Sequence, residues 1–516
     1  MRNKIKNIWI IPVVLLTMAS CYGDKGNYDY IDIRQAVIEI AAVEEGNGML
    51  VYDQFQELSL MPAVTNSDGG NVADLYDYEW GIISRTQVFP NYIPKKIIGD
   101  RKDLSYNIIE SPGDYYVTLK ATNKTTKAIT DYRFDLRVSS TSGWIVLHEN
   151  ASGAADLSII RDDQIIPGLN AEKHGVLHEL FSGVTGHKID NAKFLAWRSI
   201  TASGAAFGRL FIYTENGFYA LNDQTYELMS SNYASIFTIQ PAVLKPQANY
   251  AFPYARALEM MLNNGNIYTL AWSTMGTTGI FGNPHTIGTT VQTYEPFLAV
   301  IPTTSTGARG VLYNRVNYPE GAFVVINQFA NNFSFPSIEG AAFNPNRIGA
   351  NYHLVYLGTA NIHETGAIFR DTADGGKLYM FHANFLTTML GTPVVIGKYP
   401  LSDLPGINNA THFYFSVRGP VMYYASGNKI YSWVFGENTV NEVLTLSAGE
   451  TVTGMMNYIN NNTNATYNGR LLFVSTHNGS EGKVYKIPVN ELSGVVNGTV
   501  ESYGGFGKIL DMVLKL

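Results

Sequence analysis

Residues 412–446 read HFYFSVRGPVMYYASGNKIYSWVFGENTVNEVLTL, and this segment indicates how most of the chain is built. Strand-like runs follow one another at 412–417, 428–431, 432–435 and 442–446, with turn residues between them. Short runs rich in aromatic and β-branched residues, bounded by Gly and Asn, are typical of β-strands. The segment therefore predicts one small sheet of three or four strands.

The same unit recurs through the rest of the chain. A turn residue followed by a short apolar strand ending in Tyr appears at 217–219, 265–268, 310–313, 376–379, 428–431 and 482–485. Successive tyrosines lie 49, 45, 66, 52 and 54 residues apart. Three or four strands about every 50 residues predict the blades of a β-propeller, and the length from Gly143 onward gives about seven blades. We expect the repeated tyrosines to pack between neighbouring sheets.

Both ends of this region are strand-like. Residues 144–147 are apolar and residues 509–514 are apolar except for Asp511, and closing a ring of sheets requires its ends to be joined. We therefore predict that the two segments share one closing blade. A tandem array of β-sandwiches is the alternative, but it would not need so regular a repeat.

The preceding part of the chain has a different pattern. Apolar and polar residues alternate at 37–40, 57–60, 76–80, 115–121 and 132–138. Period-2 patterning with turn residues between the runs predicts a small immunoglobulin-like sandwich of about seven strands, over residues 34–140. Its predicted core is Trp80 packed against Tyr116, Leu119 and Leu136. The fold class is thus all-β, with this sandwich followed by the propeller at 141–516.

Composition excludes several classes of protein. The chain has 516 residues, of which 46% are hydrophobic and only 15% charged, so it is neither disordered, nor a coiled coil, nor a collagen-like fibre. The net charge is -7, and no concentrated basic face is evident. Because nucleic-acid binding depends on such a face, we expect no nucleic acid as a partner.

The N-terminus is typical of an export signal. Basic residues at 2, 4 and 6 precede an apolar run too short to span a bilayer, and small residues then lead to Cys21. The segment 16–21 resembles a bacterial lipobox, with Met18 where Leu is usual. We predict a signal peptide at 1–20, acylation of Cys21, for example by palmitate, and a tether at 21–33. Cys21 is the only cysteine, so no intramolecular disulfide forms.

No catalytic constellation is evident. The chain lacks a G-x-S-x-G elbow, a phosphate-binding loop and a C-x2-C pair. His174 and His178 have half of a zinc-site spacing, but no third ligand accompanies them. The acids of the second region are interpreted as solvated turn residues; they include Asp162, Asp163, Glu179, Asp371, Asp374 and Glu437. We therefore predict no catalytic residue, no metal site and no cofactor.

Aromatic residues in loop-like stretches are better candidates for ligand binding. They are Tyr250, Phe252, Tyr254, Phe281, His285 and Tyr294. Exposed aromatic platforms with amides nearby hold sugars or extended peptides. For each residue taken singly, packing in the core is the alternative.

Two motifs in the first region resemble PKD (polycystic kidney disease) domains. They are Tyr78-Glu79-Trp80 and the turn and strand at 111–119, SPGDYYVTL. With Cys21, the tether and the opening of the second region at 143–147, the chain resembles the PKD-like family of Bacteroidota lipoproteins. That resemblance implies a lipid-anchored protein of the outer membrane, facing the cell exterior. It also implies a partner, an importer of the SusCD type, in which a TonB-dependent barrel carries a lipoprotein lid.

These observations together predict a non-enzymatic surface lipoprotein that binds a nutrient polymer, either an oligopeptide or a glycan. A propeller-type glycan hydrolase or lyase is one alternative, and it requires acids or a histidine that converge at the central channel. An adhesin or structural spacer without a small ligand is the other.

Overall fold

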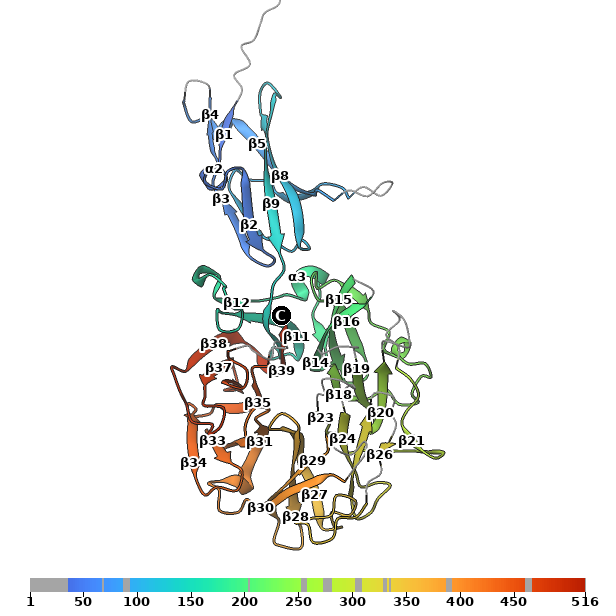
Figure 1. Cartoon of the computed structure of the whole chain (residues 1–516). Coiled ribbons are helices and arrows are strands. Elements are labelled where there is room, and N and C mark those ends of the chain that lie inside the picture. The colour runs from blue at the N-terminus through green and yellow to red at the C-terminus, as the bar shows by residue number, and fades with distance from the viewer. Residues whose placement is uncertain are drawn as a thin grey trace, which may run out of the picture. The chain divides into compact units, whose positions relative to one another are not determined.

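The computed structural model describes residues 36–66, 69–86, 93–202, 205–251, 258–271, 281–301, 309–327, 332–333, 336–386, 392–459 and 466–515. The predicted signal peptide, tether and Cys21 lie outside these residues. The chain divides into two compact units (Figure 1). The first contains the described part of Met1–Leu50, Leu58–Tyr106 and Asp114–Leu136, and the second contains Val51–Glu57, Asn107–Gly113 and Arg137–Leu516. Strands dominate both units, as predicted.

The N-terminal region forms a β-sandwich. Its largest sheet has the strand order β2-β9-β8-β5-β6, and two smaller sheets pair β1 with β4 and β3 with β7. The elements are β1 (Val37–Glu39), α2 (Ala41–Glu45), β2 (Met49–Asp53), β3 (Glu57–Leu60), β4 (Ala63–Thr65), a 3-10 turn (Ala73–Leu75), β5 (Tyr76–Ser84), β6 (Lys96–Gly99), β7 (Leu104–Asn107), β8 (Gly113–Asn123) and β9 (Ile129–Ser139).

The predicted core of the sandwich is confirmed for three of its four residues. Trp80 is fully buried opposite Leu119, and Leu136 is buried as well. The indole Nε1 of Trp80 donates to the carbonyl of Arg101 at 2.9 Å, so its polar atom is satisfied. The prediction was wrong for Tyr116, which alternates to the outer face of β8, where Arg133 lies 4.6 Å from its ring centroid.

The second unit contains seven sheets of three or more strands among the described residues, arranged around one axis (Figure 1). The first two sheets contain β14 (Ala192–Ala202), β15 (Ala205–Thr214), β16 (Phe218–Asn222) and β17 (Leu228–Ser230), and then β18 (Pro246–Ala251), β19 (Leu258–Asn263) and β20 (Asn266–Ala271). The next two contain β23 (Ala299–Ile301), β24 (Arg309–Asn314), β25 (Ala322–Asn327) and β26 (Asn332–Phe333), and then β27 (Tyr352–Ala360), β28 (Glu364–Asp371), β29 (Lys377–Asn384) and β30 (Val394–Pro400). The fifth and sixth contain β31 (Ala410–Phe415), β32 (Val421–Ser426), β33 (Lys429–Val434) and β34 (Val440–Thr445), and then β35 (Thr451–Asn457), β36 (Leu471–His477), β37 (Gly482–Pro488) and β38 (Glu501–Phe506).

The seventh sheet joins the two ends of the unit. Its order is β12-β11-β10-β39, built from β10 (Gly143–Glu149), β11 (Ala154–Arg161), β12 (Gly175–Leu177) and β39 (Lys508–Lys515), and β13 (Ile189–Asp190) also pairs with β11. Trp144 lies opposite Leu514, and Ile145 opposite Val513. The predicted closing blade is thereby confirmed. The unit also contains α3 (Ser182–Thr185), a small hairpin of β21 (Thr286–Ile287) and β22 (Thr290–Val291), and 3-10 turns at Ala171–Lys173, Tyr233–Ile236 and Ile407–Asn409.

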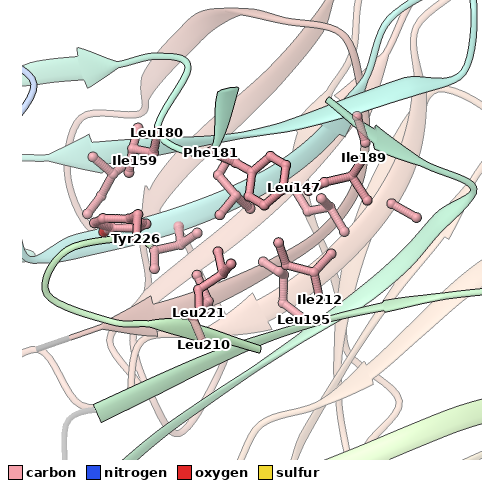
Figure 2. Close-up of a cluster of buried hydrophobic side chains, with 14 of the residues drawn as sticks. Leu147, Ile159, Leu180, Phe181, Ile189, Leu195, Leu210, Ile212, Leu221 and Tyr226 are labelled. Carbon is pink, nitrogen blue, oxygen red and sulfur yellow. The ribbon is translucent and has the colours of Figure 1, made fainter. Parts of the chain in front are cut away.

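Each sheet buries both of its faces against its neighbours. On β10, Ile145 and Leu147 pack toward β14–β16, whereas Trp144 and Val146 pack toward β36 and β37. Figure 2 shows the first of these clusters, in which Leu147 and Ile159 of the closing blade meet Leu195, Leu210, Ile212 and Leu221 of the next blade. Five further clusters join the remaining neighbours around the ring. Burial on both faces explains why these strands are continuous apolar runs, whereas the sandwich strands alternate.

The repeated tyrosines pack between sheets, as expected, but one member of the repeat was assigned wrongly. Tyr219, Tyr268, Tyr379, Tyr431 and Tyr485 lie on the third strand of their sheets and face the preceding blade. Tyr313 lies instead on β24, the second strand of its sheet, and faces the following blade.

The position equivalent to the repeated tyrosine in that sheet is Val324, which faces the preceding blade. With Val324 in the series, the spacings become 49, 56, 55, 52 and 54 residues, so the uneven 45 and 66 disappear. In the segment at 412–446, the prediction missed β32 and divided β33 in two.

Candidate functional site

The six predicted ligand residues lie in different surroundings. Phe252 and Tyr254 are outside the described residues. Phe281, His285 and Tyr294 are all buried, and His285 Nδ1 lies 2.5 Å from the hydroxyl of Tyr294. Burial lowers the pKa of His285 and raises that of Tyr294. Of the four described residues, Tyr250 alone is exposed, at 40%, so the structure does not bring the four together on one surface.

Tyr250 lies on β18, the first strand of its sheet, beside a polar network that the sequence did not indicate. The first strands lie nearest the axis of the ring, and most of them contact the first strand of the next sheet. Asn249 Nδ2 donates to the hydroxyl of Tyr213 at 2.9 Å and to Glu259 Oε1 at 2.6 Å. Glu259 is only 1% exposed, whereas Asn249 is partly exposed.

Asn249 and Tyr250 are consecutive residues of β18, so their side chains lie on opposite faces of the sheet. The amide of Asn249 is held by Tyr213 and Glu259 and stabilises the strand, whereas the ring of Tyr250 is the exposed group. Exposed aromatic rings pack against the flat or apolar faces of neutral polymers. One signal in the sequence could have identified Glu259, because it is the single charged residue in the apolar run at 258–262. A lone charge in a buried strand needs a partner, and Asn249 supplies one.

Further polar side chains on first strands are partly exposed. They are Tyr356 on β27, His412 and Tyr414 on β31, Thr453 on β35 and Asp511 on β39. In the closing blade β39 takes the place of the first strand, since it contacts β14 of the next sheet. Burial raises the pKa of Tyr414 to about 12, raises that of Tyr356, and lowers that of His412. These phenols and the imidazole are therefore uncharged at neutral pH, which suits hydrogen bonding to neutral groups.

Asp511 is the acid among these first-strand residues. Its two carboxylate oxygens accept hydrogen bonds from the backbone N–H groups of Leu195 and Met512, both at 2.8 Å. Burial raises the pKa of Asp511 to about 6 despite these bonds. The carboxylate links β39 of the closing blade to β14 of the next blade, which is a structural role.

Two acids that the sequence placed in solvated turns are buried instead. Asp162 is 2% exposed and accepts from Lys486 Nζ at 2.6 Å and from the Tyr503 hydroxyl at 2.5 Å. Asp371 accepts from Asn351 Nδ2 at 2.6 Å and from the backbone N–H of Ala373. For these two the interpretation was wrong, because hydrogen bonds satisfy each buried carboxylate: Asp162 has partners far away in the sequence, whereas those of Asp371 lie nearby.

One arrangement in the closing blade has the residue types of a nucleophile and its base. Ser158 Oγ lies 2.8 Å from His148 Nε2 and 2.9 Å from His178 Nδ1. However, Ser158 is 0% exposed, so its hydroxyl is not accessible to a polymer substrate. Asp156, nearby on β11, accepts hydrogen bonds from the Ser182 hydroxyl and from the backbone N–H groups of Phe181 and Ser182, and it fixes the start of α3.

The histidine pair at 174 and 178 does not lie on a helix. Residues 175–177 form β12, and His174 follows a 3-10 turn, so the two imidazoles do not share a helical face. Within the described ranges, no group of three or more His, Cys, Asp or Glu side chains could hold a metal ion. In the same part of the chain, no helix is both long and apolar enough to cross a bilayer.

Comparison with known proteins gives a family match for the N-terminal third of the chain and no activity. The model of the PKD-like family matches residues 21–192, about a third of the chain. No curated protein matches the chain.

Several solved structures resemble the chain at low identity. A quinonprotein alcohol dehydrogenase-like protein from Bacteroides thetaiotaomicron is 11% identical, covers 92% of this chain and 99% of that chain, and has a TM-score of 0.44. Hsv2 from Kluyveromyces lactis is 9% identical, with 73% and 98% covered and a TM-score of 0.34. A DUF4784 family protein from Bacteroides caccae is 9% identical, with 90% and 98% covered and a TM-score of 0.24. At these scores the likenesses carry no argument about function. The chain is all-β, with a PKD-like N-terminal domain and a propeller-like second unit.

Proposed function

We propose that this protein is a non-enzymatic lipoprotein of the outer membrane surface that binds a neutral nutrient polymer and assists an importer of the SusCD type. The lipobox-like segment that ends at Cys21 and the match to the PKD-like family support the anchored placement. The exposed ring of Tyr250 on β18 carries the binding part of the proposal. The ligand is an oligopeptide or a glycan, both of which offer neutral hydrogen-bonding groups and flat or apolar faces.

Replacing Tyr250 with Ala is expected to weaken polymer binding about tenfold, because a central aromatic side chain contributes more than 1 kcal/mol in a typical interface. The measurement is titration calorimetry with neutral oligosaccharides and uncharged oligopeptides that an array screen shows to bind. Tyr250→Phe keeps the ring and should retain most of the affinity. Tyr132→Ala, in the sandwich, is the matched control and should bind as the unmodified protein does.

The same screen separates the proposal from its alternatives. Equal affinity of Tyr250→Ala and the unmodified protein would exclude the site at β18. Release of shorter products from a glycan by the purified protein would favour a hydrolase or lyase. If no glycan or peptide pool binds or shifts the thermal unfolding, the protein is an adhesin or spacer.

Replacing Cys21 with Ser is expected to abolish incorporation of a labelled palmitate analogue and to release the protein from the membrane fraction. The reason is that no other cysteine exists to be acylated. Labelling, fractionation and protease treatment of intact cells measure the anchor and its orientation. Equal labelling of Cys21→Ser would contradict the anchor, and purification of the solubilised protein without any importer subunit would contradict the docking.

A further inference from the structure

A chain of hydrogen bonds runs through the closing blade and links four of its parts. Its first link is the backbone N–H of Gly507, in the turn between β38 and β39, which donates to Nδ1 of His148 on β10 at 3.2 Å. The second joins His148 Nε2 to Ser158 Oγ on β11 at 2.8 Å. The third joins Ser158 Oγ to Nδ1 of His178, next to β12, at 2.9 Å. We call these four residues the relay.

The backbone fixes the direction of every proton in the relay. An amide N–H can only donate, so Nδ1 of His148 is the acceptor and a neutral His148 carries its proton on Nε2. Nε2–H therefore donates to Ser158 Oγ. The hydroxyl proton of Ser158 is then free to donate to Nδ1 of His178. Three protons fill three links, and the relay is complete only while both imidazoles are neutral.

An additional proton destabilises the relay wherever it binds. On Nδ1 of His148 it would face the N–H of Gly507, which places two donors against each other. On Nδ1 of His178 it would donate to Ser158 Oγ, and the hydroxyl proton would then have to turn away from both imidazoles. Because Ser158 is fully buried, its hydroxyl proton gains no compensation from water in the second arrangement, whereas His148 and Gly507 of the first are partly exposed.

The surroundings favour the neutral imidazoles in the closed state. Burial lowers the pKa of His148 to about 4 and lowers that of His178, although Asp156 acts in the opposite direction on both. Phe506 packs its ring against His148 and His178, with centroids 5.6 and 5.8 Å away. Among the described residues, none of the nearby charged side chains accepts a hydrogen bond in place of His148 Nδ1, Ser158 Oγ or His178 Nδ1.

Each of these charged groups has its own partner or effect. Asp156 is held by Ser182 and lies 3.8 Å from Lys188 Nζ. Glu179 favours protonation of the adjacent His178, and Lys188 opposes that of His148. Glu481 Oε1 accepts from the N–H of Gly505, and Glu149 pairs with Lys508 at 3.1 Å. Asp156 and Glu179 favour protonation of the imidazoles, so they influence the pH at which the relay opens. They do not restore a hydrogen bond that protonation has removed.

We propose that the relay is an acid-sensitive latch that holds β12 and the turn between β38 and β39 to the body of the closing blade, and that it opens when an imidazole takes up a proton. The latch lies at the seam of the ring, where β10 meets β39. Opening would free the outer edge of that blade, where β12 pairs with β11 over three residues only.

The direction of the pH effect follows from linkage. The pKa of His148 is lower in the closed state than its ordinary value of 6.5, so the open state binds more protons as pH falls. The closed form is fully favoured above about pH 6.5 and loses that advantage progressively down to about pH 4. The ratio of closed to open molecules is expected to fall on the order of 100-fold across that range.

The test is amide hydrogen exchange of the full-length mature protein at pH 7.5 and pH 4.5, corrected for the intrinsic exchange rate. We expect the N–H groups of Gly507 and of 175–177 to lose protection at pH 4.5, while those of β32 and β33 keep it. The variant that carries both His148→Gln and His178→Gln lacks both titrating imidazoles and should abolish the pH step, whereas His148→Gln alone should reduce it. His187→Gln, an exposed histidine of the same region, is the matched control and should leave the step unchanged.

Two results would overturn the proposal. One is equal protection of Gly507 and β12 at both pH values, and the other is an unchanged step in the variant that carries both His148→Gln and His178→Gln. A nitrogen-detected NMR spectrum of the unmodified protein at pH 7.5 tests the relay even if the variant does not fold. It should show His148 protonated on Nε2 alone, and a proton on Nδ1 would contradict the relay.

Discussion

Replacing Lys486 with Met is expected to lower the free energy of unfolding of the second unit by about 3–5 kcal/mol, because it leaves a buried carboxylate without its cation. Lys486 on β37 is 1% exposed, and its Nζ lies 2.6 Å from Asp162 Oδ2 in the neighbouring closing blade. Burial alone would raise the pKa of Asp162, but hydrogen bonds from Lys486 and Tyr503 outweigh burial and hold that pKa below its usual value. Urea unfolding at pH 7 measures the loss.

Two further variants make this result specific. Asp162→Asn combined with Lys486→Met removes both charges and should recover a large part of the stability. Lys429→Met breaks the exposed pair with Glu442 and should leave the stability within experimental error. A loss below about 1 kcal/mol for Lys486→Met, comparable to an exposed pair, would show that the buried pair does not join the two blades energetically.

The pH dependence of the Lys486 variant has a definite sign. A carboxylate whose pKa is depressed in the folded state contributes stability above its unfolded pKa and loses it as the pH falls through the folded value. Without Lys486, burial dominates and the pKa of Asp162 rises. The difference in stability between the unmodified protein and the variant should therefore begin to shrink as the pH falls through this raised pKa, and it should go on shrinking below the ordinary value of 3.8 until Asp162 is protonated in the unmodified protein as well.

A chain that ends at Gly507 is expected to fail to fold its second unit cooperatively. It lacks β39, which pairs with β10 along its length and buries Ile509, Met512 and Leu514. Each such side chain contributes about 1.5–3 kcal/mol on burial, and the lost strand also exposes the edge of β10. The total loss approaches the 5–15 kcal/mol by which an ordinary domain is stable.

Circular dichroism and dye binding measure this loss of cooperative folding. A synthetic peptide of residues 508–515, added in trans, should restore a cooperative thermal transition, whereas a peptide of the same composition in scrambled order should not. A cooperative transition at the usual temperature in the truncated chain would contradict closure by β39.

The architecture could be predicted because local patterns in the sequence indicate which strands are buried on one face and which on both. Alternation in the first region and continuous apolar runs in the second follow from one buried face and two buried faces, respectively. The closing blade could be predicted because a ring needs both of its ends. The repeat was assigned wrongly at Tyr313, because this sheet has Val324 at the position where the others have tyrosine. Val324 fills the same place between the blades.

The polar interior could not be predicted in the same way. Asp162 and Lys486 are separated by 324 residues, and no local pattern distinguishes an acid with such a partner from a solvated one. The candidate site shows the same limit. Tyr250 stands out in the sequence, but its neighbours Asn249 and Glu259 matter through contacts between strands, while Phe281, His285 and Tyr294 fill the core from stretches that look like loops.

The position of β39 also constrains how the protein is made. The ribosome synthesises β10 early in the second unit, but its partner strand β39 comes after all six of the other large sheets in the chain. Until β39 has emerged, β10 has an open edge and the ring cannot close. Chaperones that bind nascent chains would therefore encounter this edge for nearly the whole time needed to translate the unit.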